Sequence, residues 1–124
     1  KGAKKEGSLV IGVSPAENKK EHVEKWEKTT REFDFIVYSG FGFKGRNVFF
    51  IRSCDAVICI GGRIGTLNEF TIAYDENRPV GILKGGGISD LIPEIIRIAD
   101  KGNTPVVYDT DPKKLVKKLL NILK

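Results

Sequence analysis

Five short runs rich in Val and Ile recur along the chain and predict buried strands. They mostly lack the strict alternation of apolar and polar residues that is typical of a strand with one face in water. Such runs favour parallel strands that are covered on both faces. The runs are SLVIGVS (8–14), FDFIVYSG (33–40), AVICIGG (56–62), PVGILKG (79–85) and TPVVYDT (104–110).

Two segments that follow runs of this kind have clear helix signals. In 88–100 the apolar residues fall on one helical stripe, which predicts a helix with one buried face. Segment 111–123 begins with Asp111-Pro112, which is an N-cap residue followed by proline at the first helical position. We therefore expect a helix after each of the last two runs.

Three other segments have weaker helical patterns. Segment 17–32 is polar, and we expect Trp26 to pack it onto the sheet. Segment 46–54 is short and strongly apolar, and the pattern does not decide between core and a subunit interface. The first residues, KGAKKEG, look like the end of a helix that stops at Gly7.

Alternation of strands and helices predicts the fold class. We expect one domain over residues 1–124, an α/β fold with a doubly wound, Rossmann-like, mostly parallel sheet and helices on both faces. Ligands of such sheets bind at the carboxyl ends of the strands. Three of the five expected strand ends are rich in glycine, which indicates close approach of the backbone to a ligand.

Composition narrows the class of protein. With 40% hydrophobic and 30% charged residues the chain is globular, and it has no apolar run of 18 residues that could span a membrane. We see no signal peptide and expect a cytoplasmic protein. The chain contains no Met, so we expect an N-terminal portion of the fold to be missing from it.

The net charge of +5 comes largely from lysines near the two ends of the chain. The C-terminal lysines alternate with leucines and valine, as on the solvent face of an amphipathic helix. No basic run is interleaved with stacking aromatic residues, so we do not expect nucleic acid as a partner.

The cysteines and the single histidine of the chain do not indicate a metal site or redox chemistry. Cys54 and Cys59 have the spacing of neither a zinc site nor a redox pair, and we expect both to be buried and reduced. His22, the single histidine, stands among charged residues and is expected to be solvated. We therefore predict no metal site and no histidine-based catalytic triad.

The loop GFGFKG, residues 40–45, matches the dinucleotide pattern G-x-G-x-x-G after a strand. The rest of that fingerprint is absent, because the next strand ends in Gly61-Gly62 where an acidic residue should hold the ribose. We interpret 40–45 as a loop at the strand end that happens to fit the pattern.

The loop GGRIGTLNEF, residues 61–70, is the stronger candidate site. Its glycines allow a sharp passage from strand to helix, and the free amides of a helix N-terminus attract phosphate, with the Thr66 hydroxyl as a further donor. Glu69 is unexpected beside an anion. The spacing Thr66-x-x-Glu69 also fits a capping box, in which the glutamate only satisfies a backbone amide.

This loop resembles the P-G-G-x-G-T-x-x-E signature of the Lonely Guy proteins, which are cytokinin-activating phosphoribohydrolases often mislabelled lysine decarboxylases. Their wider Rossmann-like superfamily includes the molybdenum-cofactor carrier protein and the DNA-processing protein DprA. The upstream stretch GRNVFFIRSCDAVICIGG resembles the same family, and the strongest similarity spans 45–83. The resemblance implies that a first strand–helix–strand portion with its own phosphate loop is missing here.

The resemblance also implies roles for individual residues. Four residues of the loop would hold the 5′-phosphate of a nucleotide. Arg63 lies inside the loop and could reach the phosphate, or its side chain could stand in solvent at the tip of the loop. Arg46 and Glu69 match the pair that the family uses to cleave the bond between ribose and base. A carboxylate facing the sugar would stabilise positive charge on the ribose. The four phosphate-holding residues are Gly61, Gly62, Gly65 and Thr66.

Two departures from the family pattern bear on the function. Ile60 replaces the signature proline, and Gly45-Arg46-Asn47 replaces Glu-Arg-Lys, so the chain resembles the carrier-protein and uncharacterised branches more. Three hypotheses follow: a phosphoribohydrolase for nucleoside 5′-monophosphates, a non-catalytic carrier or sensor of a phosphorylated cofactor, and a DNA-associated protein. We expect a nucleotide monophosphate or phosphate as ligand, no required cofactor, and a homo-oligomer.

Overall fold

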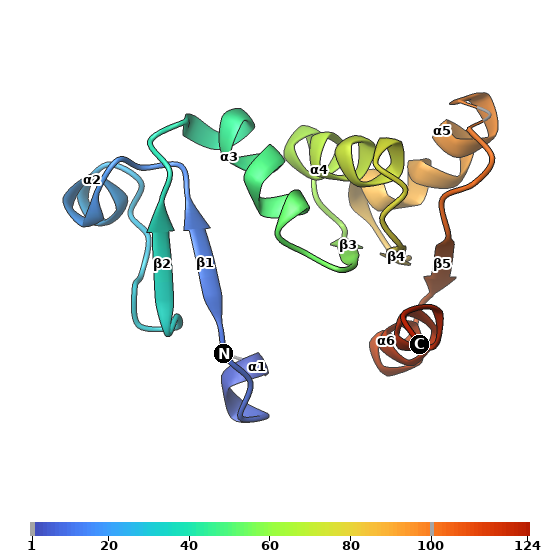
Figure 1. The fold of residues 1–124 in the computed structure, drawn as a ribbon, viewed down its shortest axis with the longest axis horizontal. Coiled ribbons are helices and arrows are strands. Elements are labelled where there is room, and N and C mark those ends of the chain that lie inside the picture. The colour runs from blue at the N-terminus through green and yellow to red at the C-terminus, as the bar shows by residue number, and fades with distance from the viewer. Residues whose placement is uncertain (1, 100) are drawn as a thin grey trace. The chain divides into compact units, whose positions relative to one another are not determined.

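The computed structural model describes residues 2–99 and 101–124 and divides the chain into two compact units, Lys1–Phe50 and Ile51–Lys124 (Figure 1). The first residue of the expected N-terminal helix end and the last residue of the expected helix 88–100 lie outside the described residues. At the N-terminus the short helix α1, Gly2–Lys5, is followed by Gly7 with φ +72°, as the helix stop predicted at this glycine requires.

The first unit is built on two parallel strands. Strand β1 pairs in register with β2, so that Ile11 lies opposite Phe35 and Ser14 opposite Tyr38. Helix α3 begins in this unit and ends in the second. The further elements are β1 (Ile11–Ser14), α2 (Lys19–Glu24), β2 (Phe35–Tyr38) and α3 (Gly42–Arg52).

Helix α2 is much shorter than the segment 17–32 that the polar pattern suggested. It begins after Asn18, whose side chain accepts a hydrogen bond from the Glu21 amide, and it ends at Glu24. Glu27 then takes a left-handed backbone with φ +49°, which a helix cannot continue through. Trp26 lies beyond the end of α2 and packs edge-to-face on Phe43 of α3, with ring centroids 4.6 Å apart.

The second unit is a three-stranded parallel sheet in the order β3-β4-β5. Each strand is followed by helical structure, as the alternating pattern predicts. The elements are β3 (Val57–Ile60), α4 (Ile64–Asp75), β4 (Val80–Leu83), the 3-10 helix η1 (Gly87–Leu91), α5 (Ile92–Ala99), β5 (Val106–Asp109) and α6 (Pro112–Ile122).

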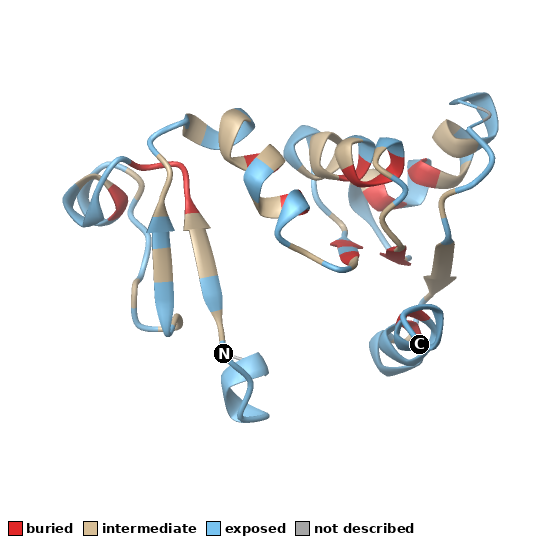
Figure 2. Cartoon of the chain, viewed as in Figure 1, coloured by how far each residue is buried: buried red, intermediate tan, exposed pale blue. Residues whose placement is uncertain are grey.

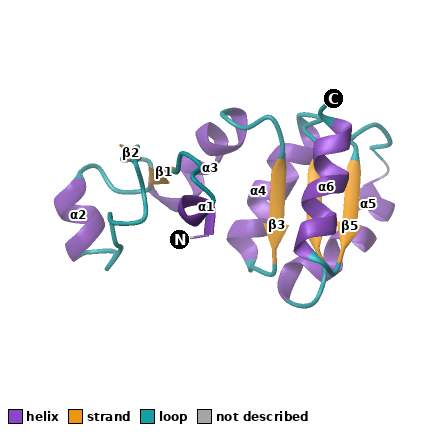
Figure 3. Ribbon diagram, turned by 90° about the horizontal axis from the view of Figure 1, so that it is seen from below, coloured by secondary structure: helices purple, strands orange, loops and turns teal. Residues whose placement is uncertain are grey.

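Helices cover both faces of this sheet (Figure 3). On one face α4 buries Phe70 and Ala73 against the strands, and Val80 and Ile82 of β4 are fully buried; red bands mark this core in Figure 2. On the other face lies α6. Gly81 of β4 faces α6, and a Cβ atom there would be in ordinary van der Waals contact with the side chain of Leu115, at 3.4 Å. Apolar burial on both faces stabilises the unit.

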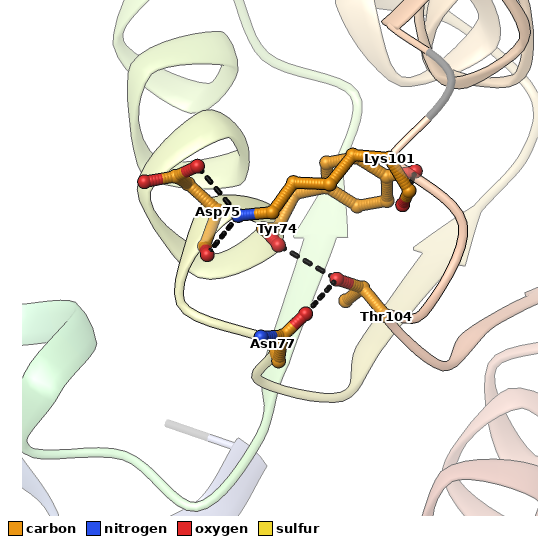
Figure 4. Close-up of polar contacts among 5 residues, drawn as sticks. All are labelled: Tyr74, Asp75, Asn77, Lys101 and Thr104. Atoms are coloured by element: carbon orange, nitrogen blue, oxygen red, sulfur yellow. Dashed lines mark hydrogen bonds and ion pairs between the residues drawn. The ribbon is translucent and has the colours of Figure 1, made fainter.

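The end of α4 is joined to the segment before β5 by polar contacts (Figure 4). The Tyr74 hydroxyl donates to the Lys101 carbonyl at 2.7 Å, and the Thr104 hydroxyl donates to the Tyr74 carbonyl at 2.6 Å. Lys101 Nζ lies 2.6 Å from the Asp75 carboxylate. The Thr104 hydroxyl thus donates to a carbonyl in the last turn of α4, where carbonyl groups lack partners inside the helix.

The fold class is confirmed, since the chain forms parallel strands that alternate with helices, and each of the five apolar runs contains one strand. A single sheet was predicted, whereas the strands within residues 2–99 and 101–124 pair as one sheet of two strands and one of three. Hydrophobic periodicity predicts that a segment is a strand, but it carries no information on which strand lies beside it.

Candidate functional site

The glycine loop after β3 is the candidate site, and its backbone explains its composition. Gly61 and Gly62 both have left-handed backbones, with φ +55° and +80°, a region that other residues enter at a cost. A Cβ atom at position 62 would also overlap the side chain of Thr66, approaching the Thr66 Cβ to 2.5 Å. The two glycines therefore allow the sharp turn into α4 and leave room for Thr66 beside the loop.

A second glycine-rich segment holds this loop in place. The backbone amide of Ser89 donates to the Gly61 carbonyl at 3.1 Å, and the Ser89 hydroxyl donates to the same oxygen at 2.6 Å. The amide of Ile88 donates to the Gly62 carbonyl at 3.1 Å. Ser89 is 0% exposed, so these bonds are protected from water. Three donors from η1 thus fix two successive carbonyl groups.

This anchoring determines the direction of the loop amides. In a trans peptide the C=O and N–H groups point in opposite directions. Because the carbonyls of Gly61 and Gly62 are turned toward η1, the amides of Gly62 and Arg63 are turned away from it. Both residues are exposed, as are Ile64 and Gly65 in the first turn of α4. The loop therefore presents backbone donors to solvent at a helix N-terminus, the arrangement that attracts anions.

The capping-box interpretation of Thr66 and Glu69 is wrong. Helix α4 begins at Ile64, and its N-cap residue is Arg63, whose side chain makes no capping hydrogen bond. Thr66 is thus the third helical residue, and Glu69 lies in the second turn. The spacing T-x-x-E matched the motif, but the turn imposed by Gly61 and Gly62 starts the helix earlier than the motif requires.

Glu69 is half-buried on α4, and its negative charge affects the thiol of Cys59 on β3. Burial of Cys59, with a smaller contribution from the negative charge of Glu69, raises the pKa of the Cys59 thiol to about 11. Cys54 is also a free thiol, and burial raises its pKa as well. Both cysteines are therefore protonated at neutral pH, as expected of structural cysteines, although Cys54 is only partly buried.

Arg46, the other residue that the resemblance assigns to bond cleavage, lies in the first unit. Helix α3 begins at Gly42, so Arg46 stands in its second turn and does not open the helix as expected. Its Nη1 donates to the Val13 carbonyl of β1 at 2.6 Å, and its guanidinium lies 5.9 Å from the centre of the Phe43 ring. The roles of Arg46 and Glu69 in cleavage remain predictions.

One buried polar pair in the first unit, Ser14 and His22, was not predicted from the sequence. His22 was expected to be solvated, yet it is 6% exposed, and its Nδ1 lies 2.8 Å from the Ser14 hydroxyl oxygen. Its ring packs edge-to-face on Tyr38. The expectation was wrong because His22 faces the sheet from a helix whose neighbouring residues are charged.

Within residues 2–99 and 101–124, no group of three or more His, Cys, Asp or Glu side chains is placed to hold a metal ion. No helix in the described part of the chain is long and apolar enough to cross a bilayer.

Comparison with known proteins matches the chain to a family. A sequence model described as the SLOG cluster4 family matches residues 1–116. An uncharacterized protein of Archaeoglobus fulgidus is 36% identical over 84 residues, which are 68% of this chain and 50% of that protein. The chain thus spans about half the length of this curated relative.

Two solved structures are similar. The X-ray structure of TM1055, a structural genomics target, superposes with a TM-score of 0.64 and 32% identity, over 75% of this chain and 50% of that one. The molybdenum cofactor binding protein of the phototrophic bacterium Rippkaea orientalis superposes with a TM-score of 0.78 and 26% identity, over 99% of this chain and 68% of that one. These matches support the wider superfamily, while the narrower assignment to the Lonely Guy proteins stays a prediction.

Proposed function

Because the chain belongs to the SLOG cluster4 family, we propose that its glycine loop binds the phosphate group of a phosphorylated small molecule, which the protein carries or senses without cleaving it. The observation that supports this function most directly is the anchoring of the Gly61 and Gly62 carbonyls by Ile88 and Ser89. It leaves the following amides turned outward before any ligand arrives. Donors that are already oriented reduce the cost of ordering on binding.

The chemistry of the loop suits a phosphate. Amide groups at the N-terminus of α4 and the Thr66 hydroxyl supply hydrogen-bond donors, and the helix dipole favours negative charge at this end. Arg63 is exposed at the N-cap of α4 and adds a positive charge beside the loop. In this proposal the carboxylate of Glu69 faces the uncharged part of the ligand, away from the phosphate.

A carrier is favoured over a hydrolase by two observations. The solved structure that covers 99% of this chain is that of a molybdenum cofactor binding protein, whose name describes binding. The chain also has Ile60 and Asn47 where the phosphoribohydrolase pattern has proline and lysine. We therefore propose a pterin-type phosphorylated cofactor as the first ligand class to test, and a nucleoside 5′-monophosphate as the second.

Calorimetric titration of the chain with inorganic phosphate, the group that both ligand classes share, and with AMP, a member of the second class, tests the binding proposal. Thr66→Val removes one hydroxyl donor, and we expect it to weaken binding about fivefold, corresponding to a net hydrogen-bond contribution of about 1 kcal/mol. Thr71→Val is the matched control, because the Thr71 hydroxyl lies on the same helix but donates to the Asn68 carbonyl at 2.9 Å. Equal affinities of the two variants for phosphate would contradict the assigned role of Thr66.

The same preparation distinguishes carrier, hydrolase and DNA-binding protein. Incubation with a panel of nucleoside monophosphates should release no ribose 5-phosphate from a carrier. Release that disappears in Glu69→Gln and in Arg46→Gln would establish the hydrolase instead. Retention of DNA with a steep dependence on salt would favour the DNA-associated alternative.

A further inference from the structure

The first unit contains a cavity that the glycine loop does not help to form. Its volume is about 480 Å³, and all of its lining residues come from positions 11–50, in β1, α2, β2, α3 and the segments between them. This volume lies within the range of small-molecule sites, which is roughly 300–1,000 Å³.

Aromatic side chains form much of the wall. Trp26 and Phe43 meet edge-to-face at 4.6 Å, and both line the cavity. Phe33 lies against the backbone of Gly12, where an added Cβ atom would come within 2.8 Å of the ring. Gly12 therefore lets the Phe33 ring lie close to β1. Rings fixed in this way offer a flat ligand both apolar area and favourable ring–ring geometry.

The polar lining is buried and ordered. Ser14 is 3% exposed, and its hydroxyl oxygen accepts a hydrogen bond from the Ala16 amide at 3.1 Å. The same oxygen lies 2.8 Å from His22 Nδ1, while His22 Nε2 lies 3.4 Å from the Thr29 carbonyl. These contacts fix the imidazole and the hydroxyl, which also line the cavity. A ligand therefore meets a polar patch of defined geometry beside the aromatic walls.

The ionisable side chains in the lining of the cavity are all basic. The groups in its lining that can carry a positive charge are those of His22, Lys28 and Arg46, and the lining contains no Asp or Glu. Arg46 is held in position by its bond to the Val13 carbonyl. A cavity lined by one sign of charge favours a ligand of the opposite sign. The site therefore combines aromatic walls with positive charge.

We propose that this cavity binds a small, flat aromatic anion, such as a fused-ring carboxylate, with the rings between the aromatic walls and the anionic group toward Lys28 and Arg46. The site goes beyond the phosphate-binding function proposed for the glycine loop, because residues 11–50 form it and the loop 61–66 contributes no wall. Either proposal can therefore fail without the other.

Trp26 makes the site easy to observe, because it is the only tryptophan of the chain and lines the cavity. Its indole N–H gives a single resonance in a nitrogen–proton correlation spectrum. The probes are 2-naphthoate and its neutral amide, 2-naphthamide, which have nearly the same shape and differ in charge. We expect saturable movement of the Trp26 resonance with both probes and tighter binding of the anion, with affinities checked by calorimetry.

Variants test the contribution of charge and of the aromatic wall separately. Lys28→Gln should weaken 2-naphthoate about two- to fivefold and leave 2-naphthamide unchanged, as expected for a partly solvated charge pair. Lys20→Gln, which changes an exposed lysine of α2 outside the lining, should affect neither probe. Phe43→Leu should weaken both probes.

Three outcomes would overturn the proposal. They are the absence of a saturable Trp26 shift with either probe, equal affinities for the anion and the amide, and an equal loss in the Lys20 and Lys28 variants. Phosphate titration of the same sample, observed at the amides of Gly62 and Arg63, reports on the glycine loop independently.

Discussion

Replacement of Gly87 by alanine tests the packing of the two glycine segments on which the candidate site depends. Gly87 has φ +71°, where a residue with a side chain is strained by about 1–2 kcal/mol. An added Cβ atom would also lie 2.7 Å from the Gly61 carbonyl carbon and 2.8 Å from the Gly62 carbonyl oxygen. Both neighbours are backbone atoms, which cannot turn aside as a flexible side chain can.

The expected magnitude follows from these two contributions. Overpacking of a close contact costs about 1–3 kcal/mol, so strain and overlap together should lower the free energy of unfolding by about 2–5 kcal/mol. A domain of this size has a total stability of about 5–15 kcal/mol. Gly87→Ala should therefore lower the midpoint of urea unfolding clearly and leave the slope m unchanged.

Two control variants separate strain from overlap. Gly85 has φ +126° but no atom within 4 Å of an added Cβ, so Gly85→Ala carries backbone strain alone. Gly102 has neither feature, and Gly102→Ala should be close to neutral. The measurement is urea unfolding followed by circular dichroism. If Gly87→Ala were no less stable than Gly85→Ala, the close packing of Gly87 on Gly61 would not contribute as argued.

Two further predictions concern the same unit. Ser89→Ala removes the hydroxyl donor to the Gly61 carbonyl but leaves the backbone donor, so we expect a loss of about 1 kcal/mol in unfolding free energy and weaker phosphate binding in calorimetry; unchanged phosphate affinity would show that the hydroxyl does not orient the loop. The pKa of Cys59 is raised to about 11 from an ordinary value of 9.0. The folded state therefore holds the thiol proton more strongly than the unfolded chain does. This contribution to the free energy of unfolding is fully present below pH 9 and is lost as pH rises from about 9 to 11, by up to about 2–3 kcal/mol. Urea unfolding at pH 8 and pH 10.5 should show this loss in the parent protein and a smaller one in Cys59→Ala.

Local signals in the sequence predicted the parts of the fold that depend on neighbouring residues. Asp111 caps α6 as expected, accepting a hydrogen bond from the Lys114 amide at 2.9 Å, with proline at the start of the helix. The glycines of the loop after β3 have the left-handed backbones that a tight turn requires. Such features arise from the residue's own conformational limits, so a short stretch of sequence contains them.

Features that depend on distant residues could not be predicted. Ser89 holds the carbonyl of Gly61 across 28 positions, and no local pattern marks Ser89 as a partner of the loop. His22 is buried because it faces Ser14 and Tyr38 on the sheet, although its sequence neighbours are charged. In both cases tertiary contacts determine the environment, and the composition of the surrounding segment misleads.

The most direct test of the central claim is a titration of the isotope-labelled chain with inorganic phosphate, followed residue by residue at the backbone amides. The account predicts saturable shifts with one affinity at Gly62, Arg63 and Gly65, because these amides lie at the outward side of the loop and at the start of α4. It predicts much smaller shifts at Lys117 and Lys118 of α6, which are exposed lysines beyond the first turn of their helix. Shifts that did not saturate, or that followed the surface lysines and spared the loop, would contradict the claim that the glycine loop is a phosphate site.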